Sequence, residues 1–318
     1  MGSLLALGHR RRSTQYDTGA APGLLAGILL SQQFGTDWYV NSAAAAGGDG
    51  RTPDSAYDTL QEAIDAAVAG DRILVAPGHA ETVTSTSITL SKASVTVICL
   101  GNGLHRPTFT YGAAAATITV SAANVTWIGG HFIANFDNVA APFTIGAAKD
   151  FSLQGASFVD NSSALHFLSI VVTGATNNAA DGLAILGNSW HGLAVAPAAF
   201  ISVLGNLSFL RVEDNFTDMA STDDEASFIT LSSKVLLAAR ILRNHHIVVG
   251  AAGNTVGIFL TGSATTCTGI VADNRVASLD TTTELLATAG TGLKFFDNLY
   301  TGVADKSGYL VPAADSAV

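Results

Sequence analysis

Short apolar runs that each end in asparagine recur from about residue 130 to the C-terminal end of the chain. The seven asparagines are Asn135, Asn161, Asn188, Asn215, Asn244, Asn274 and Asn298, and neighbouring members lie 24 to 30 residues apart. A repeat of about this length is typical of a solenoid, in which each repeat forms one coil and stacks on the next. The spacing therefore predicts one coil for each step between asparagines.

The positions in front of the asparagines alternate as a half-buried strand does. Three positions before each asparagine the residue is apolar: Phe132, Phe158, Ile185, Val212, Ile241, Val271 and Phe295. Five positions before it, the residue is small or apolar in every run, from Gly130 to Leu293. Side chains two apart lie on one face of a strand. We therefore expect one inward-facing stack, followed by a single turn column of seven asparagines, a residue that accepts left-handed backbone and bonds to its own kind when stacked.

The chain before residue 130 is less regular but predicts the same architecture. Short β-branched runs are found at 71–78, 87–90, 95–98 and 116–120. Residues 58–67 predict a short helix with Leu60 and Ile64 on its apolar face and Gly70 beyond its end. A solenoid needs such a cap because its end strands are exposed edges. The fold class expected is all-β: a right-handed parallel β-helix with an N-terminal capping helix and an extended N-terminal arm.

These N-terminal segments also carry a family resemblance. The succession of segments 59–67, 70–78 and 95–98 resembles the opening of the pectate-lyase-like β-helix superfamily. The resemblance covers about residues 57–300. The superfamily includes pectate lyases, polygalacturonases, epimerases, phage tailspikes and phage capsid decoration proteins, so the resemblance implies the fold and leaves the function open.

The limits of the repeat divide the chain into four parts. We expect an N-terminal arm at 1–36, an N-terminal cap with the short helix at 37–70, the β-helix at 71–300 and a C-terminal tail or cap at 301–318. The arm holds a basic run and an apolar patch, and we expect these residues to bind a partner: Arg10, Arg11, Arg12, Leu24, Leu25, Ile28, Leu29 and Leu30. An ordinary solvated tail is the alternative for the basic run.

Composition argues against several classes of protein but does not identify the function. Charged residues make up 13% of the chain and the net charge is −10, which argues against a nucleic-acid binder because such proteins need a clustered basic face. Residues 182–210 contain no Asp, Glu, Lys or Arg, but Asn188, Pro197 and Asn206 interrupt them, so we expect no transmembrane helix. Two cysteines are too few for a disulfide framework, and we expect Cys99 to be a buried thiol. No cofactor and no metal ion are expected.

The column directly before the asparagines is the best candidate for chemistry. Because neighbouring coils lie about 4.8 Å apart, we expect Arg243 to stack between Asp214 and Asp273. A lyase-like site would place Asp214, Asp273 and Glu213 on a cation, with Arg243 as the base. The alternative is a ladder of opposite charges on an exposed turn, and an arginine between the acids would neutralise a cation site. We therefore expect no catalytic set, and Asp214, Arg243 and Asp273 remain the alternative.

The remaining surface favours contact with other proteins. It is rich in Ala, Ser, Thr and Val, and weakly charged faces suit close packing against another chain. We expect a structural virion protein made in the host cytoplasm. More specifically, we expect a homotrimeric capsid decoration (cement) protein of a tailed phage or prophage that binds the major capsid or another virion protein through its arm. The alternative is a tailspike-like β-helix that binds or cleaves a polysaccharide; the hydrolase pattern is incomplete, because no Asn-x-Asp lies one coil before Asp223 and Asp224.

Overall fold

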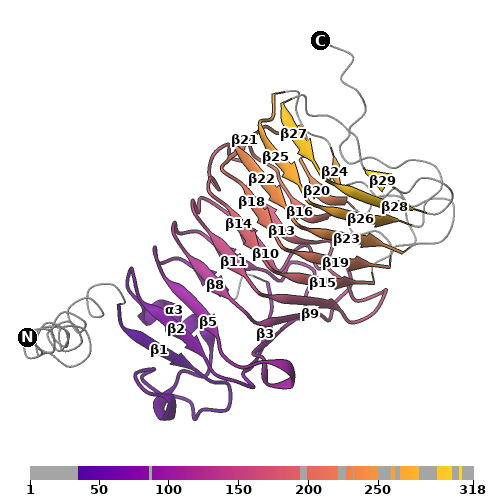
Figure 1. Cartoon of the computed structure of the whole chain (residues 1–318). Coiled ribbons are helices and arrows are strands. Elements are labelled where there is room, and N and C mark those ends of the chain that lie inside the picture. The colour runs from indigo at the N-terminus through magenta and orange to yellow at the C-terminus, as the bar shows by residue number, and fades with distance from the viewer. Residues whose placement is uncertain are drawn as a thin grey trace, which may run out of the picture.

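The computed structural model describes residues 35–85, 88–193, 199–220, 227–231, 233–249, 259–261, 266–278, 292–302 and 308–309. The chain winds into stacked coils with parallel strands (Figure 1), so the predicted parallel β-helix is confirmed. Three sheets, which we name A, B and C, run along the resulting rod. Each coil contributes its strands in the order C, A, B.

The strand bounds follow from the hydrogen-bonded order of each sheet. Sheet A consists of β1 (Asp37–Val40), β2 (Arg72–Val75), β5 (Thr96–Cys99), β8 (Thr126–Ile128), β11 (Ser152–Gln154), β14 (Ala184–Leu186), β18 (Arg211–Glu213), β22 (Ala239–Leu242), β25 (Gly269–Ala272) and β27 (Leu293–Phe296). Sheet B consists of β3 (Ala80–Val83), β6 (Thr108–Tyr111), β9 (His131–Ala134), β12 (Ser157–Asp160), β15 (Ser189–Gly192), β19 (Phe216–Met219), β23 (His245–Val248), β26 (Arg275–Ser278), β28 (Leu299–Gly302) and β29 (Gly308–Tyr309). Sheet C consists of β4 (Ile88–Leu90), β7 (Ile118–Val120), β10 (Phe143–Ile145), β13 (Ser169–Thr173), β16 (Ala199–Ser202), β20 (Ser227–Thr230) and β24 (Leu260–Thr261). A small pair, β17 (Leu207–Ser208) and β21 (Leu236–Leu237), lies beside sheet A, and β28 with β29 is the one antiparallel pair among the described strands.

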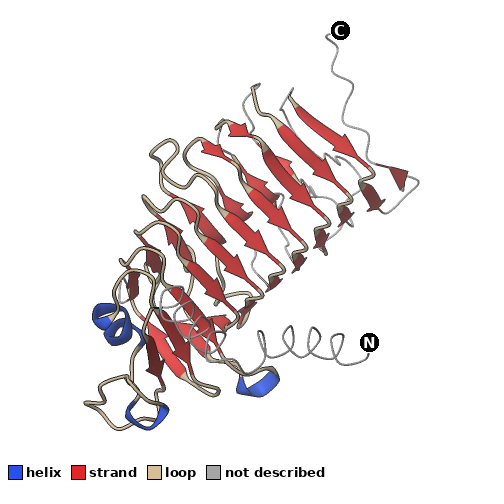
Figure 2. Cartoon of the chain, turned by 60° about the vertical axis from the view of Figure 1, so that its left-hand side comes forward, coloured by secondary structure: helices blue, strands red, loops and turns tan. Residues whose placement is uncertain are grey.

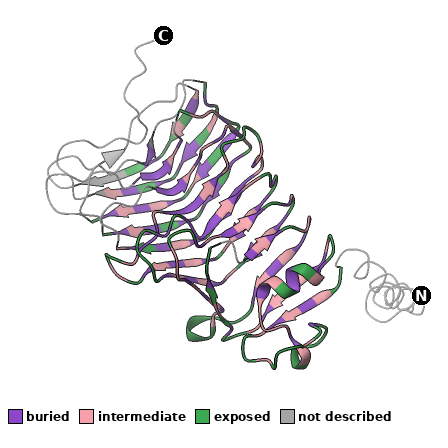
Figure 3. Ribbon diagram, turned by 180° about the vertical axis from the view of Figure 1, so that it is seen from behind, coloured by how far each residue is buried: buried purple, intermediate pink, exposed green. Residues whose placement is uncertain are grey.

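The core is built of side-chain stacks that run along the rod. Buried and partly exposed residues alternate along the strands (Figure 3), as the period of two predicts. In sheet A the fully buried side chains Leu153, Ile185, Val212, Ile241 and Val271 lie in register on successive strands. Continuous burial of this kind supplies the main stabilising free energy of the fold, about 1.5–3 kcal/mol for each large aliphatic side chain.

The expectation of a single stack is wrong for Phe132 and Phe158. Both lie in sheet B, where their rings stack with centroids 4.9 Å apart. They are fully buried, as expected, but they belong to a different side of the core from Ile185 and Val212. The apolar spacing therefore identifies core positions correctly without telling which sheet holds them.

The expected column of seven asparagines is wrong in the same way for Asn135 and Asn161. These two follow strands of sheet B, and Asn161 donates a hydrogen bond from Nδ2 to Oδ1 of Asn135 on the exposed side of that corner. The other five precede strands of sheet B and lie at the corner between sheets A and B: Asn188, Asn215, Asn244, Asn274 and Asn298. One coil is longer than its neighbours, because Ser157 pairs with Ser189, 32 residues further along the chain. Asn161 and Asn188 lie 27 residues apart without being one coil apart.

The five asparagines at the A–B corner form a buried ladder. From Asn188 to Asn298, the Nδ2 of each donates to the Oδ1 of the next, at 2.9–3.1 Å. The same Oδ1 accepts the backbone N–H of the preceding asparagine, as Asn244 does for Asn215 at 3.0 Å. Each Nδ2 also donates to the carbonyl of an inward residue of the previous coil, and in Asn244 this partner is Val212 at 2.8 Å. The ladder therefore satisfies polar groups that no water reaches.

The left-handed backbone at this corner belongs to the residue before each asparagine, not to the asparagine itself. These residues are Gly187, Asp214, Arg243, Asp273 and Asp297, with φ between +49° and +62°. The left-handed residue turns the chain by one tight step, and the asparagine that follows fastens the turn to the coils on both sides.

The N-terminal end is closed by a short helix, α3 (Leu60–Ala66), with two 3-10 turns nearby, η1 (Pro53–Ser55) and η2 (Gly103–His105). The helix packs against β1, β2 and β4 and buries Leu60 and Ile64 in the core. Figure 2 shows the helices gathered at the N-terminal end of the stack. Sheet A already begins with β1, within the segment expected to be a cap.

Two expectations from composition can be compared with the described residues. Both Cys99 and Cys267 are buried free thiols, and burial raises the pKa of Cys99 above its usual range. None of the helices described is long and apolar enough to cross a bilayer.

Candidate functional site

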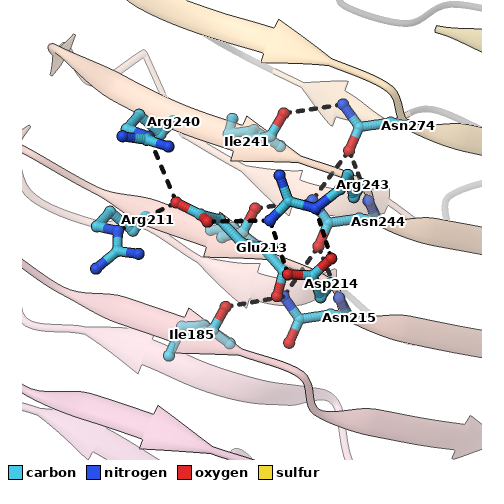
Figure 4. A network of polar contacts seen from close by, with 11 residues as sticks. Ile185, Arg211, Glu213, Asp214, Asn215, Arg240, Ile241, Arg243, Asn244 and Asn274 are labelled. Carbon is cyan, nitrogen blue, oxygen red and sulfur yellow. Dashed lines mark hydrogen bonds and ion pairs between the residues drawn. The ribbon is translucent and has the colours of Figure 1, made fainter.

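Among the described residues, the largest convergence of ion pairs lies on the outer face of sheet A, next to the asparagine ladder. Strand alternation turns Arg211 and Glu213 of β18 outward on either side of the buried Val212. Arg240 of β22 lies directly beside Arg211 in the register of the sheet. The left-handed corner then brings Asp214 and Arg243 to the edge of the same face. We call these five residues, Arg211, Glu213, Asp214, Arg240 and Arg243, the arginine cluster (Figure 4).

The cluster is centred on Glu213, whose side chain is 8% exposed. Its Oε1 accepts from Nε of Arg211 at 3.1 Å and lies 3.4 Å from Nε of Arg240. Its Oε2 accepts from Nη2 of Arg243 at 3.3 Å. Arg243 also holds Asp214 with two parallel bonds, from Nε at 2.7 Å and from Nη2 at 2.8 Å. Three guanidinium groups thus converge on two carboxylates.

The electrostatics favour the charged forms of Glu213, Asp214 and Arg243. Burial would raise the pKa of Glu213, but the hydrogen bonds and charges of the three arginines outweigh it and lower that pKa. The hydrogen bond from Arg243 lowers the pKa of Asp214, and the bond to Asp214 in turn raises the pKa of Arg243. An arginine with a raised pKa is a poor proton acceptor. This geometry therefore gives no support to Arg243 as the base of a lyase reaction.

The structure assembles only part of the alternative catalytic set. Arg243 stands between Asp214 and Asp273 in the corner column, as expected. Its side chain pairs with Asp214 and Glu213. In the described part of the chain no hydrogen bond or ion pair joins Arg243 to Asp273. Asp273 is exposed at the same corner one coil further along, where its backbone N–H donates to the carbonyl of Phe296. A ladder of opposite charges, the expected alternative to a lyase-like site, describes these residues better, and Glu213 lies at its centre.

A cation has no prepared site here. The oxygens of Glu213 and Asp214 are already taken up by guanidinium groups. Among the residues that the structure describes, no group of three or more histidine, cysteine and carboxylate side chains is arranged to hold a metal ion. The cluster can instead recognise an anion, because guanidinium groups have five N–H donors each and only some of them are engaged.

Sequence reasoning missed Arg211 and Arg240. Each lies four positions before an asparagine of the ladder, Asn215 and Asn244 respectively. That common spacing could have shown that the two arginines stack on adjacent coils. The expected partner-binding residues Arg10, Arg11, Arg12, Leu24, Leu25, Ile28, Leu29 and Leu30 lie outside the described residues, as do Asp223 and Asp224.

We expect Glu213→Gln to lower the free energy of unfolding by about 1–3 kcal/mol, because it leaves three arginines around a nearly buried group that has lost its charge. The matched variant Asp214→Asn removes a carboxylate that is 55% exposed, and we expect a loss below about 1 kcal/mol. The measurement is urea denaturation of each variant at pH 7 and again in acid.

The pH dependence has a definite sign. Since the folded pKa of Glu213 is lowered, its stabilising contribution is complete above the unfolded value of about 4.3 and disappears as the pH falls below it. The difference between wild type and Glu213→Gln should therefore shrink in acid. A Glu213→Gln protein as stable as wild type at pH 7 would show that the cluster contributes nothing to the fold.

Comparisons with known proteins add little to this geometry. No family model matches the sequence, and no curated protein matches it. Among solved structures the fold resembles a rhamnogalacturonan lyase (13% identity over 87% of this chain and 90% of that chain, TM-score 0.36) and the pectin methylesterase from Aspergillus niger (12%, 88% and 92%, TM-score 0.37). It also resembles ORF18 of Geobacillus virus E2 (14% identity, 89% of this chain and 64% of that chain, TM-score 0.32). These similarities are too low to carry an argument, so the assignment of a parallel β-helix rests on the strand pairing of the chain itself.

Proposed function

We propose that this chain is a structural virion protein of a tailed phage or prophage, and specifically a capsid decoration protein. In this role the β-helix is a stiff rod and the arm ahead of residue 35 anchors it to the major capsid or another virion protein. The chain would be made in the host cytoplasm and incorporated into the particle.

The observation that supports this proposal is that buried polar side chains of the rod form hydrogen bonds to backbone groups of other segments. At the N-terminal end, Glu81 accepts from the first N–H of helix α3, at Leu60, and lies 3.1 Å from Nε2 of the buried His79. Asp160 accepts the backbone N–H groups of Phe167 and Leu193. Together with the asparagine ladder, these groups hold separate segments of the chain together at several levels of the rod. A scaffold needs such fastening, whereas acid–base catalysis needs carboxylates free to exchange protons with a substrate.

A second candidate, a tailspike-like protein that binds or cleaves a polysaccharide, is favoured by one observation. The arginine cluster carries three positive charges against two negative ones, and its guanidinium groups are about half exposed. A surplus of arginine at a surface suits an acidic sugar. The cluster offers no paired acid and base, so binding is better supported than cleavage.

The experiment is a deletion of residues 1–34. The cut is placed there because Gly35 and Thr36 are already fastened to the cap, by hydrogen bonds to Gly70 and Asp71. We expect the truncated chain to fold and melt like the full chain, but to be absent from purified particles, because its apolar and basic anchor has been removed. Gel analysis of particles made with each form is the measurement.

The full chain expressed in the same way is the control for incorporation. Normal loading of the truncated chain would contradict the anchoring role of the arm. Release of reducing ends or unsaturated products from polygalacturonate, alginate or host capsular material would replace the decoration proposal with the tailspike one.

A further inference from the structure

One corner between sheets A and B is enlarged into an exposed turn. Residues 100–107 join β5 to β6 through the 3-10 turn η2, whereas only two residues join β14 to β15 at the same corner of a later coil. Leu104, in the middle of the turn, is 101% exposed. The base of the turn is closed by the N–H of Gly78, which donates to the carbonyl of His105 at 2.9 Å. The turn therefore lies outside the core but is fastened to it.

This turn contains an asparagine whose surroundings are the opposite of those in the ladder. Asn102 is exposed, and its side chain makes no capping hydrogen bond to η2. In the ladder, by contrast, Nδ2 of Asn244 donates to Val212 and Asn274, and its Oδ1 accepts from Asn215. A ladder side chain is held away from the main chain that follows it, whereas the side chain of Asn102 is free to turn toward its own.

The residue after Asn102 makes that approach easy. Asn102 is the one asparagine of the chain that is followed by glycine. Gly103 has φ +56°, and a Cβ added to it would meet nothing within 4 Å apart from its chain neighbours. Glycine has no side chain to shield its nitrogen. This nitrogen also lies at the start of a helical turn, where main-chain N–H groups have no acceptor within the turn.

We propose that Asn102 is a self-modifying site, which converts to aspartate and isoaspartate through attack by the main-chain nitrogen of Gly103. This nitrogen becomes a nucleophile when a base in solution removes its proton. Its bond to Cγ of Asn102 forms, the bond from Cγ to Nδ2 breaks, and Nδ2 leaves as ammonia after taking up a proton from water. The product is a five-membered cyclic imide.

Water then opens the imide at one of its two carbonyl carbons. The hydroxyl group adds to the carbon, the bond from that carbon to the nitrogen of Gly103 breaks, and the nitrogen regains a proton. Opening at Cγ gives aspartate. Opening at the main-chain carbonyl gives isoaspartate, in which the chain runs through the former side chain.

Both products change the turn without reaching the core. Each replaces a neutral amide by a carboxylate, which is charged at neutral pH, close in sequence to His105 and Arg106. Isoaspartate also lengthens the main chain by one carbon, so the hydrogen bond from His105 to the carbonyl of Asn102 loses its geometry. The bond between Gly78 and His105 confines the change to the turn. The inference concerns this turn alone and does not depend on the virion proposal.

The test follows the full-length chain during storage at pH 7 and at pH 9, by peptide mass spectrometry and ion exchange. We expect the peptide with Asn102 to lose its amide first, the chain to gain one negative charge, and the reaction to be faster at pH 9. Asn161 is the internal comparison, because it is exposed but followed by serine, and it should keep its amide much longer. The stored protein should melt like the fresh one.

Gly103→Ala tests the role of the glycine. The added methyl group has room, and Ala238 already has φ +54° in this chain, so the variant should fold. The methyl group hinders the attack, and we expect a reaction about tenfold slower or more, which corresponds to about 1.4 kcal/mol on the barrier. Asn102→Gln should not react in the same period, because its longer side chain would have to close a six-membered ring.

Three results would overturn the inference. The first is an Asn102 that keeps its amide while Asn161 or a ladder asparagine loses its own. The second is a Gly103→Ala protein that reacts as fast as wild type. The third is a stored wild-type protein that has unfolded, since the change would then not be confined to the turn.

Discussion

Val212→Asp should abolish folding of the β-helix. Val212 is fully buried between Ile185 and Ile241 in the sheet A stack, and its position on β18 points it into the core. A carboxylate there would have no partner and no water. An unpaired buried charge is destabilising by several kcal/mol at least, against a total stability of about 5–15 kcal/mol for an ordinary domain. Because each coil is the template for the next, the damage extends to both neighbours.

The matched control is Val159→Asp, the same substitution at an outward position of β12. Val159 lies beside the exposed His191 in the register of sheet B, so its aspartate remains in contact with water. We expect this variant to be expressed and to melt cooperatively within a few degrees of wild type. Circular dichroism and the fraction of protein recovered from the supernatant distinguish the two outcomes. A folded, cooperatively melting Val212→Asp protein would mean that β18 is turned the other way.

The sequence predicts the core positions well because the alternation of buried and exposed residues involves only consecutive residues of one strand. The period of two around Val212 or Ile241 follows from the strand itself and needs no knowledge of the neighbouring coils. The capping helix is similarly local: it was expected at 58–67 and lies at Leu60–Ala66, with Thr59 as its N-cap. Such features depend on a few consecutive residues.

The register between coils depends on distant residues, and there the sequence misleads. Asn161 and Asn188 are separated by a distance that fits one coil, although they lie at different corners. The coil that contains Leu165 and Thr173 is longer than its neighbours, and only the pairing of Ser157 with Ser189 reveals this. Counting residues cannot distinguish a long coil from a change of corner.

The arginine cluster, too, could be predicted from the sequence only in part. The acids and Arg243 were expected at one corner, and Asp214 with Arg243 is indeed such a pair. Arg211 contacts Glu213 from two positions earlier on the same strand, whereas Arg240 and Arg243 reach it from the next coil. The last two contacts exist only once the coils are stacked, so the sequence predicted opposite charges at this corner without showing that three arginines converge on Glu213.

The asparagine ladder gives the second large effect. Asn244 is fully buried, and Asn244→Ala would remove the acceptor of the backbone N–H of Asn215 and the Nδ2 donor to the carbonyl of Val212 and to Oδ1 of Asn274. Each unsatisfied buried group costs about 1–3 kcal/mol, so we expect a loss of about 3 kcal/mol or more. Asn135→Ala removes the same side chain from an exposed corner, where its Oδ1 accepts from Nδ2 of Asn161, and surface changes of this kind alter stability by about 0.5 kcal/mol or less.

The direct comparison of these two alanine variants decides whether the rod is built around a buried ladder of five asparagines. Urea unfolding, followed by the fluorescence of the buried Trp127 and Trp190, gives the free energy of each variant against wild type. We expect Asn244→Ala to unfold at a much lower urea concentration, and Asn135→Ala to coincide with wild type. Equal losses in the two variants would contradict the structure, because they would place Asn135 and Asn244 in one column.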